Sequence, residues 1–299
     1  MSRPTYVLVT AANNEERFIG TTIESVVAQT LPPREWVIVS DVSRDRTEAI
    51  VESCAAKYPY IRLLRITKDH PRNFEAQVNA INLGFAELDS TPYDFIGNLD
   101  ADVTFAPDYF AGLLARFEGN PRLGLAGGTL REQDGRVHAA LRGERLQSVP
   151  HAIQLFRRAC HEALGQRYRA LRYGGPDTYA EILARMKGWE VESFPELMVQ
   201  HHRITASTGG VLRGRFRQGQ MDFSLGYDPA FQVFKCARRL GEPPALLGAL
   251  LRLAGYFYSG LRGEEHLVPD DFIQFLRTEQ RHRLRNFIQG PTHASSRPF

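Results

Sequence analysis

Two carboxylates stand one residue apart where an apolar run ends, since Asp100 and Asp102 follow residues 95–99. Such a D-x-D pair suits a hard divalent cation, because Mg²⁺ is held in proteins by one or two carboxylates together with the phosphate oxygens of a substrate. Aspartate is also frequent in the solvated turns that connect strands and helices. The pair alone therefore leaves both a metal site and an ordinary turn open.

Other polar residues follow apolar runs in the same way. Asn13 and Glu15 follow the first run, Asp41 follows the second, and His201 ends a later one. In an open α/β sheet, ligands bind outside the carboxyl ends of the strands, and the acidic residues Asp41, Asp100 and Asp102 are expected at those ends. Structural roles are equally open: Asp41 and Asp177 suit helix N-caps, and His201 suits a strand end.

Strand and helix patterns alternate along the first part of the chain. Strands are expected at 6–9, 36–39, 61–66 and 95–99, and helices around 19–27, 50–54 and 74–88. This alternation implies right-handed βαβ units, and hence an α/β fold with a mostly parallel sheet flanked by helices. Further along, Asp177 or Thr178 is expected to be the N-cap of another helix.

The order of these pieces resembles glycosyltransferase family 2, whose members use nucleotide-diphosphate sugars and have the Rossmann-like GT-A fold. The resemblance covers roughly residues 5–235. It rests on five motifs in the family's order: A-A-N-N-E-E at 11–16, V-S-D-V-S-R-D-R-T at 39–47, L-D-A-D at 99–102, G-P-D-T at 175–178 and V-Q-H-H at 199–202. Five motifs in sequence are far more specific than the D-x-D pair alone.

The resemblance implies a role for each motif. Asp177 would be the general base, and Asp102 with His201 would hold Mg²⁺ or Mn²⁺ on the donor diphosphate. The nucleotide sugar would be bound by residues at the strand ends, namely Ala11, Asn13, Glu15, Asp41 and Asp100. We add Arg72 to this group, because it can reach a phosphate from its loop; a solvated loop arginine is the other reading.

These roles fit the chemistry of sugar transfer. Breaking the bond to a diphosphate builds negative charge on the leaving oxygen, which a cation stabilises. A hydroxyl acceptor is a weak nucleophile, so a carboxylate base is needed to take its proton. One base and one displacement imply inversion at the anomeric carbon, whereas a retaining hydrolase uses a second carboxylate as nucleophile.

Three positions depart from the family's motifs. Ser40 replaces the first aspartate of the D-D-G-S motif and Val42 replaces its glycine, while Pro176 replaces the glutamate that precedes the base. The expected base, Asp177, is present. The departures leave the nucleobase open, with UDP and GDP as the expected donor classes.

Composition excludes several other classes of protein. The 299 residues are 43% hydrophobic and 24% charged with a net charge of +3, which is typical of a globular protein and makes no case for nucleic acid. The three cysteines are widely spaced and predict neither a disulfide framework nor a zinc site. The first residues lack a signal-peptide pattern, so a cytoplasmic location is expected.

The last part of the chain has a different character. We expect a catalytic domain at 1–235 and a helical extension at 236–299. Two amphipathic helices are predicted, at 246–261 with Arg252 opposite the apolar face, and at 270–288. They can lie on the inner surface of the cell membrane, pack against the catalytic domain or a second protomer as in a homodimer, or, least in keeping with Arg252, span the bilayer.

The function expected from the whole sequence is inverting transfer of a sugar to a hydroxyl of a glycan or lipid-linked glycan, in bacterial surface or exopolysaccharide synthesis. Single additions are expected, because the Q-x-x-R-W signature of processive synthases is absent. A sugar nucleotidyltransferase is one alternative, although its glycine-rich, lysine-bearing loop is missing after the first strand. A non-catalytic subunit that binds sugar nucleotides or glycans is the other.

Overall fold

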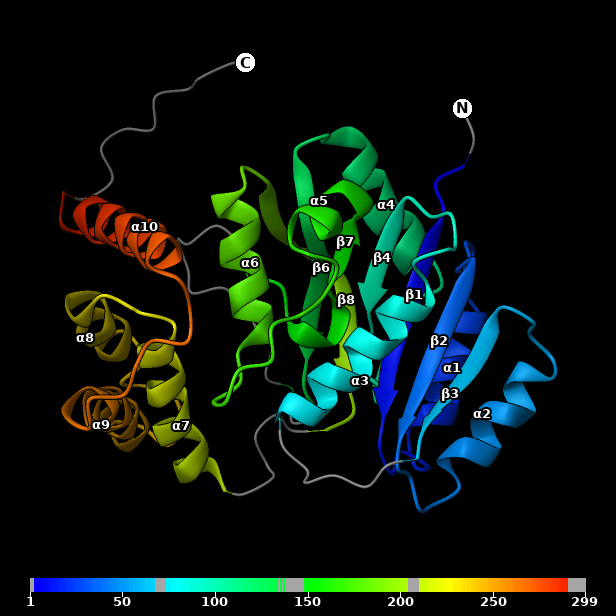
Figure 1. The fold of residues 1–299 in the computed structure, drawn as a ribbon, viewed down its shortest axis with the longest axis horizontal. Helices are drawn as coiled ribbons and strands as arrows, with labels where there is room; N and C mark the ends of the chain where they lie inside the picture. The colour runs from blue at the N-terminus through cyan, green and yellow to red at the C-terminus, as the bar shows by residue number, and fades with distance from the viewer. Residues whose placement is uncertain are drawn as a thin grey trace. The chain divides into compact units, whose positions relative to one another are not determined.

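The computed structural model describes residues 3–67, 74–133, 135, 137, 148–203 and 210–289. The chain divides into two compact units, Met1–Thr205 and Ala206–Phe299. Each unit is described here by itself (Figure 1).

The first unit is built on one eight-stranded sheet with the strand order β3-β2-β1-β4-β7-β6-β8-β5 (Figure 1). Its strands are β1 (Tyr6–Ala12), β2 (Glu35–Asp41), β3 (Ile61–Ile66), β4 (Phe95–Asn98), β5 (Val103–Phe105), β6 (Leu123–Arg131), β7 (Leu155–Arg157) and β8 (Glu190–His201). The expected α/β fold is confirmed, and all four strands expected in the first part of the chain are present.

The sheet is parallel in its first half and mixed in its second. β1 runs parallel to both β2 and β4, and β2 runs parallel to β3. β7 is antiparallel to β4 and β6, and β5 is antiparallel to β8. The sequence patterns did not predict β5 and β7, because three residues are too few to show a period of two.

Helices cover both faces of this sheet. They are α1 (Ile19–Val27), α2 (Thr47–Ala55), α3 (Phe74–Glu87), α4 (Tyr109–Gly119), α5 (Arg158–Ala163) and α6 (Pro176–Met186), with a 3₁₀ turn η1 (His151–Ile153). Alternate residues of β1 point to opposite faces, so Leu8 packs in one buried cluster with α1 and α4, whereas Val7 and Val9 pack in another with α3. The two apolar layers hold the carboxyl ends of the strands in register.

The described residues of the second unit, 210–289, form four helices: α7 (Val211–Ser224), α8 (Pro229–Ala237), α9 (Leu247–Leu261) and α10 (Asp270–Gln289). The boundary expected after residue 235 falls inside α8. α7 and α9 approach so closely that a Cβ on Gly219 would lie 2.0 Å from the carbonyl oxygen of Arg252, and a Cβ on Gly255 would lie 2.0 Å from that of Phe216. Glycine is therefore required at both positions.

The predicted amphipathic helices at 246–261 and 270–288 correspond to α9 and α10. α9 has its apolar face outward, since Leu250 is 51% exposed and Leu261 is 90% exposed, whereas Arg252 on the opposite face is 6% exposed. The glycine-lined contact with α7 explains this orientation, because only the small-residue face of α9 permits such close approach. Among the described residues, no helix combines the length and the hydropathy that crossing a bilayer requires.

Candidate active site at the carboxyl ends of the strands

Three potential metal ligands lie together at the carboxyl end of the sheet. Asp100 and Asp102 occupy the short segment between β4 and β5, and His201 ends β8. Antiparallel pairing sets Val103 opposite His201, which brings the histidine beside the carboxylates. One ligand atom from each of the three residues lies within 4.8 Å of the others, and Nε2 of His201 is 3.3 Å from Oδ1 of Asp102.

A third acidic residue, Glu132, lies behind the histidine. Oε1 of Glu132, which is 2% exposed, lies 4.0 Å from Nδ1 of His201. Burial alone would lower the pKa of His201, but the neighbouring carboxylates, led by Asp102, raise it. Two carboxylates, an imidazole nitrogen and an acid behind the imidazole form a donor set that fits a divalent cation.

Arg203 joins this cluster to the first loop. Its guanidinium pairs with the carboxylate of Glu15, and its Nε lies 3.3 Å from Oδ2 of Asp102. Burial raises the pKa of Glu15 to about 7, Arg203 opposes this rise, and Asp102 adds to it. Sequence analysis did not select Arg203, although its place directly after the histidines at the end of β8 was a usable signal.

The expected nucleotide-binding residues lie at the ends of β1 and β2. The parallel register sets Ala11 beside Val39, and the side-chain amide of Asn13 donates to the backbone carbonyl of Asp41. Asp41 is only 7% exposed. Arg72, the remaining expected contact, lies outside the described residues.

The departures from the family's motif after β2 have local consequences. The hydroxyl of Ser40 donates to Oε1 of Glu48 at 2.6 Å and thereby helps to lower the pKa of that glutamate. Val42, where the motif has glycine, has φ of 54°. This left-handed conformation is common for glycine and rare for β-branched residues. The turn therefore has the backbone conformation that suits the motif's glycine, although valine occupies the position.

Asp177 lies in the first turn of α6. The prediction that Asp177 or Thr178 is the N-cap is wrong, because Gly175 occupies that position with φ of 87° and Pro176 follows as the first helical residue. Proline suits this place because its fixed φ is helical and its missing N–H would be unpaired there in any case. Asp177, which is partly exposed, is therefore the second residue of the helix, two positions after the cap.

His151 is a site residue that sequence analysis missed. Its Nδ1 lies 3.8 Å from Oδ1 of Asp100, and the amide of Asn98 donates to its backbone carbonyl at 2.6 Å. Burial would lower the pKa of His151, but Asp100 and then Asp177 raise it, which places both carboxylates in its electrostatic environment. It comes from the stretch 129–173, which carries no motif.

One ring nitrogen of His151 has no hydrogen-bond partner among the described residues. This nitrogen, Nε2, is buried. A buried polar atom without a partner is costly, so such atoms at functional sites often await a ligand.

Glu181, one turn after Asp177 on α6, predicts a pH dependence of stability. Burial, reinforced by Asp177, raises its pKa to about 8, although it accepts a hydrogen bond from the backbone of Val149 at 2.6 Å. A raised folded-state pKa contributes stability below the unfolded value near 4.5, and this stability is lost as pH rises through 8. We expect the unfolding midpoint in urea to fall from pH 6 to pH 9.

The variant Glu181→Gln is expected to remove most of this fall, because an amide does not ionise. Glu192→Gln is the matched control, since Glu192 is exposed in β8 and should retain the wild-type pH profile. An identical fall in wild type and Glu181→Gln would assign the pH dependence to other groups.

Sequence comparison places the chain among transferases. A family described as glycosyl transferase family 2 matches residues 7–173. The probable glycosyltransferase YdaM of Bacillus subtilis (strain 168) is 36% identical over 103 residues, which are 34% of this chain and 23% of that protein. A beta-monoglucosyldiacylglycerol synthase of Synechocystis sp. is 24% identical over 195 residues, 64% of this chain and 38% of that protein. The chain thus spans less than half the length of these relatives.

Solved structures share the fold. A mannosyltransferase of Pyrobaculum calidifontis in complex with GDP-Man and Mn²⁺ has a TM-score of 0.58 at 17% identity, over 98% of this chain and 89% of its own. TarS 1-349 of S. aureus in complex with UDP-GlcNAc has a TM-score of 0.56 at 12% identity, over 87% and 73% of the two chains. At these identities the likeness concerns the fold alone.

Proposed function

The chain belongs to glycosyltransferase family 2 and has the GT-A fold, and on that premise we propose that it transfers a sugar from a nucleotide-diphosphate donor to a hydroxyl group. The observation that carries the proposal is the cluster of Asp100, Asp102 and His201 beside the ends of β1 and β2. A diphosphate held there would have its nucleoside near Asp41 and its sugar directed toward Asp100.

Asp102 and His201 would hold the divalent cation, Mg²⁺ or Mn²⁺. When bound, the cation would stabilise the negative charge that develops on the leaving diphosphate. Mg²⁺ strongly prefers oxygen ligands, so the imidazole nitrogen of His201 favours Mn²⁺. Glu132 would orient the imidazole from behind, as acids behind metal-bound histidines do.

Asp177 would act as the general base and take the proton of the acceptor hydroxyl during attack. Its carboxylate is free of the capping role, because Gly175 and Pro176 begin the helix. A single displacement of this kind inverts the anomeric carbon. Asp100 and Asp177 both raise the pKa of His151. The buried Nε2 of His151 would form a hydrogen bond with a sugar hydroxyl.

The donor and acceptor classes are proposed from the relatives. GDP-Man and UDP-GlcNAc occur in the structures of similar fold, so UDP and GDP are the donor nucleotides that we test first. The name of the Synechocystis relative describes a glucosylated diacylglycerol, which supports a lipid-linked acceptor. We extend this to a role in bacterial surface polysaccharide synthesis, on the cytoplasmic side of the membrane.

We also propose a membrane-surface position, which the exposed apolar face of α9 supports. Catalysis would lie in the motif-bearing part of the chain, within residues 1–235, and the helices of the remainder would contact the membrane surface. Exposed Leu250, Phe257 and Leu261 would lie against the lipid. A second copy of the chain is the alternative occupant of this face.

Thermal unfolding with nucleotides tests the proposal. We expect UDP or GDP, with Mn²⁺ present, to raise the unfolding temperature, because a ligand at about 100 times its dissociation constant adds about 2.7 kcal/mol of stability. Chelator should abolish the shift, and CDP and dTDP serve as comparisons. The proposal fails if no nucleotide with Mn²⁺ or Mg²⁺ stabilises the protein.

A further inference from the structure

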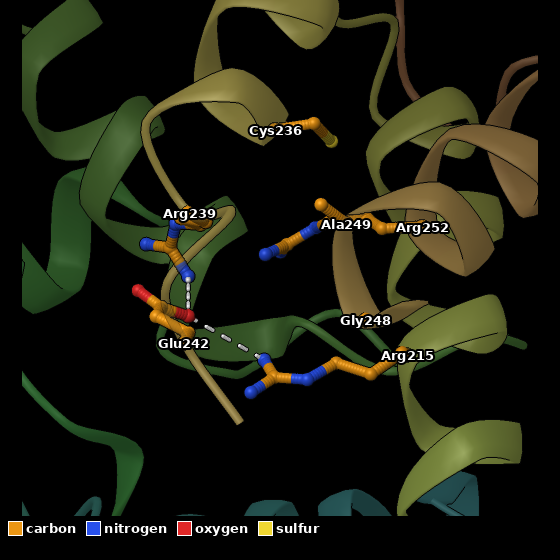
Figure 2. A pocket seen from close by; sticks show the side chains of 7 residues that line it. All are labelled: Arg215, Cys236, Arg239, Glu242, Gly248, Ala249 and Arg252. Atoms are coloured by element: carbon orange, nitrogen blue, oxygen red, sulfur yellow. Dashed lines mark ion pairs between the residues drawn. The ribbon is translucent and has the colours of Figure 1, made fainter. Parts of the chain in front are cut away.

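A small pocket lined by arginines lies within the second unit (Figure 2). Arg215 comes from α7, Arg239 and Glu242 follow α8, and Arg252 comes from α9, whose first residues Gly248 and Ala249 complete the wall. Figure 2 shows the guanidinium of Arg252 pointing into the space beside Arg239 and Glu242. The residues that line the pocket all belong to the second unit.

The orientation of Arg252 is set by a buried carboxylate. Asp222 of α7 is fully buried and accepts a hydrogen bond from Nε of Arg252 at 2.9 Å. The same carboxylate accepts from Gln232 at 3.0 Å and from Lys235 at 2.9 Å. Three donors therefore hold Asp222 in place, and Asp222 in turn holds the guanidinium of Arg252 in one orientation.

Part of that guanidinium has no partner. Arg252 is only 6% exposed, and its Nη1 is buried without a hydrogen-bond acceptor among the described residues. Nε of Arg239 is also buried and has no hydrogen-bond acceptor among the described residues. An arginine N–H that is buried without an acceptor is costly, because the donor loses its water without replacement. Two such donors around one pocket point to a missing anion.

The carboxylate that lines the pocket, that of Glu242, forms only long ion pairs with the arginines. Oε2 of Glu242 lies 3.6 Å from Nη1 of Arg239 and 3.8 Å from Nη1 of Arg215, both beyond hydrogen-bond distance (Figure 2). Glu242 is thus a loosely held counter-ion.

Positive charge remains in excess around the pocket. Three arginines and Lys235 face two carboxylates, Asp222 and Glu242. Burial, followed by the repulsion of Arg252, lowers the pKa of Lys235 to about 7, which is the effect expected where cations are crowded. The first turn of α9 adds the positive end of its helix dipole. Both features favour an added negative charge.

We propose that Arg215, Arg239 and Arg252 form a binding site for a phosphate group. Planar guanidinium groups match the oxygens of phosphate with paired hydrogen bonds, and Nη1 of Arg252 and Nε of Arg239 are the donors that a phosphate would satisfy. Glu242 would be displaced from between the arginines. The site does not depend on the sugar-transfer activity. Its phosphate would be either a free ion or the head group of a lipid. A lipid would find apolar side chains nearby, because exposed Leu247 and Leu250 are close in sequence to the residues that line the pocket.

Titration calorimetry of the full-length chain with inorganic phosphate, in the presence of chelator, measures this site without cation-assisted binding at the strand ends. Arg215→Gln and Arg239→Gln should each weaken phosphate binding at least about tenfold, because each removes a charge-assisted hydrogen-bond donor from the phosphate. Glu242→Gln should tighten it, since the competing carboxylate loses its charge. These residues were chosen because Arg252→Gln would leave buried Asp222 short of a partner and risk unfolding.

Arg213→Gln is the matched control, because Arg213 is an exposed arginine on the same helix as Arg215 and its loss changes the net charge equally. It should bind phosphate like the wild type. Equal losses in Arg213→Gln and Arg239→Gln would overturn the proposal by showing a general charge effect.

Vesicle sedimentation distinguishes the two sources of phosphate. If the phosphate is a lipid head, the chain should sediment with vesicles that contain phosphatidic acid and not with pure phosphatidylcholine, and Arg239→Gln should reduce this binding. If the phosphate is a free ion, calorimetry alone should show the effect of Arg239→Gln. The site as proposed is overturned if neither inorganic phosphate nor phosphatidic acid binds in an Arg239-dependent manner.

Discussion

Asp177→Asn is expected to lower turnover by about 10²- to 10⁴-fold while donor affinity stays within the wild-type range, because the amide keeps the shape of the side chain but cannot accept the proton. Release of nucleoside diphosphate from the donor identified by thermal unfolding measures turnover. Nucleotide-dependent stabilisation of the same variant measures donor binding. The combination separates a catalytic base from a residue that only contacts the donor.

Asp108→Asn is the matched control for this experiment. Asp108 is exposed and precedes α4 as its N-cap without a side-chain hydrogen bond to the helix, so the same chemical change is made at another helix start. Wild-type turnover is expected. Full activity in Asp177→Asn would remove Asp177 from the mechanism, and a measurable loss of donor affinity would assign it to binding instead. A non-catalytic binding subunit would show no turnover in either variant or in the wild type.

Asp102→Asn is expected to abolish the Mn²⁺-dependent part of nucleotide stabilisation and to lower turnover by about 10²- to 10³-fold, the range seen when one group that stabilises developing charge is removed. Asp102 is the residue of the cluster that contacts both His201, at 3.3 Å, and Arg203, at 3.3 Å. The negative charge of Asp102 thus interacts with two residues, and the neutral amide of the variant would lose this attraction to both. Thermal unfolding with and without chelator measures the first effect.

Two further measurements make this result specific. The unfolding temperature of Asp102→Asn without nucleotide shows whether the loss of the ion pair with Arg203 destabilises the fold itself. Asp108→Asn again supplies the control for the chemical change. Retention of a full, chelator-sensitive nucleotide shift in Asp102→Asn would show that a cation is held elsewhere, and the cluster at the strand ends would then need another role.

Local pattern was enough to predict the first half of the sheet. β1, β2, β3 and β4 are buried runs separated by helices, and their pairing in parallel follows from the handedness of βαβ units. The carboxyl ends of parallel strands share an edge, so the placement of Asp41, Asp100 and Asp102 at that edge also followed from local sequence. The expected roles of these side chains remain predictions.

Contacts between distant segments were not predictable in the same way. Arg203 and Glu15 are 188 residues apart, and they meet because β5 and β8 pair antiparallel at the end of the sheet. His151 meets Asp100 through η1, which lies in a stretch without a motif. Asp177 was misassigned as a cap because a glycine in the left-handed region, Gly175, followed by proline, caps α6 two residues earlier than the side-chain preference indicated.

The second unit shows the same division most clearly. The sequence by itself determined that Leu250, Leu261 and their neighbours share one face of α9, with Arg252 opposite, because helical period depends only on spacing. Tertiary structure decided which face is buried. Gly219 and Gly255 let α7 and α9 approach on the side of Arg252, and the buried carboxylate of Asp222 compensates the charge that this brings inside. Close packing and charge pairing across helices outweighed the usual tendency of the apolar face to turn inward, and neither is visible in the spacing of residues along one helix.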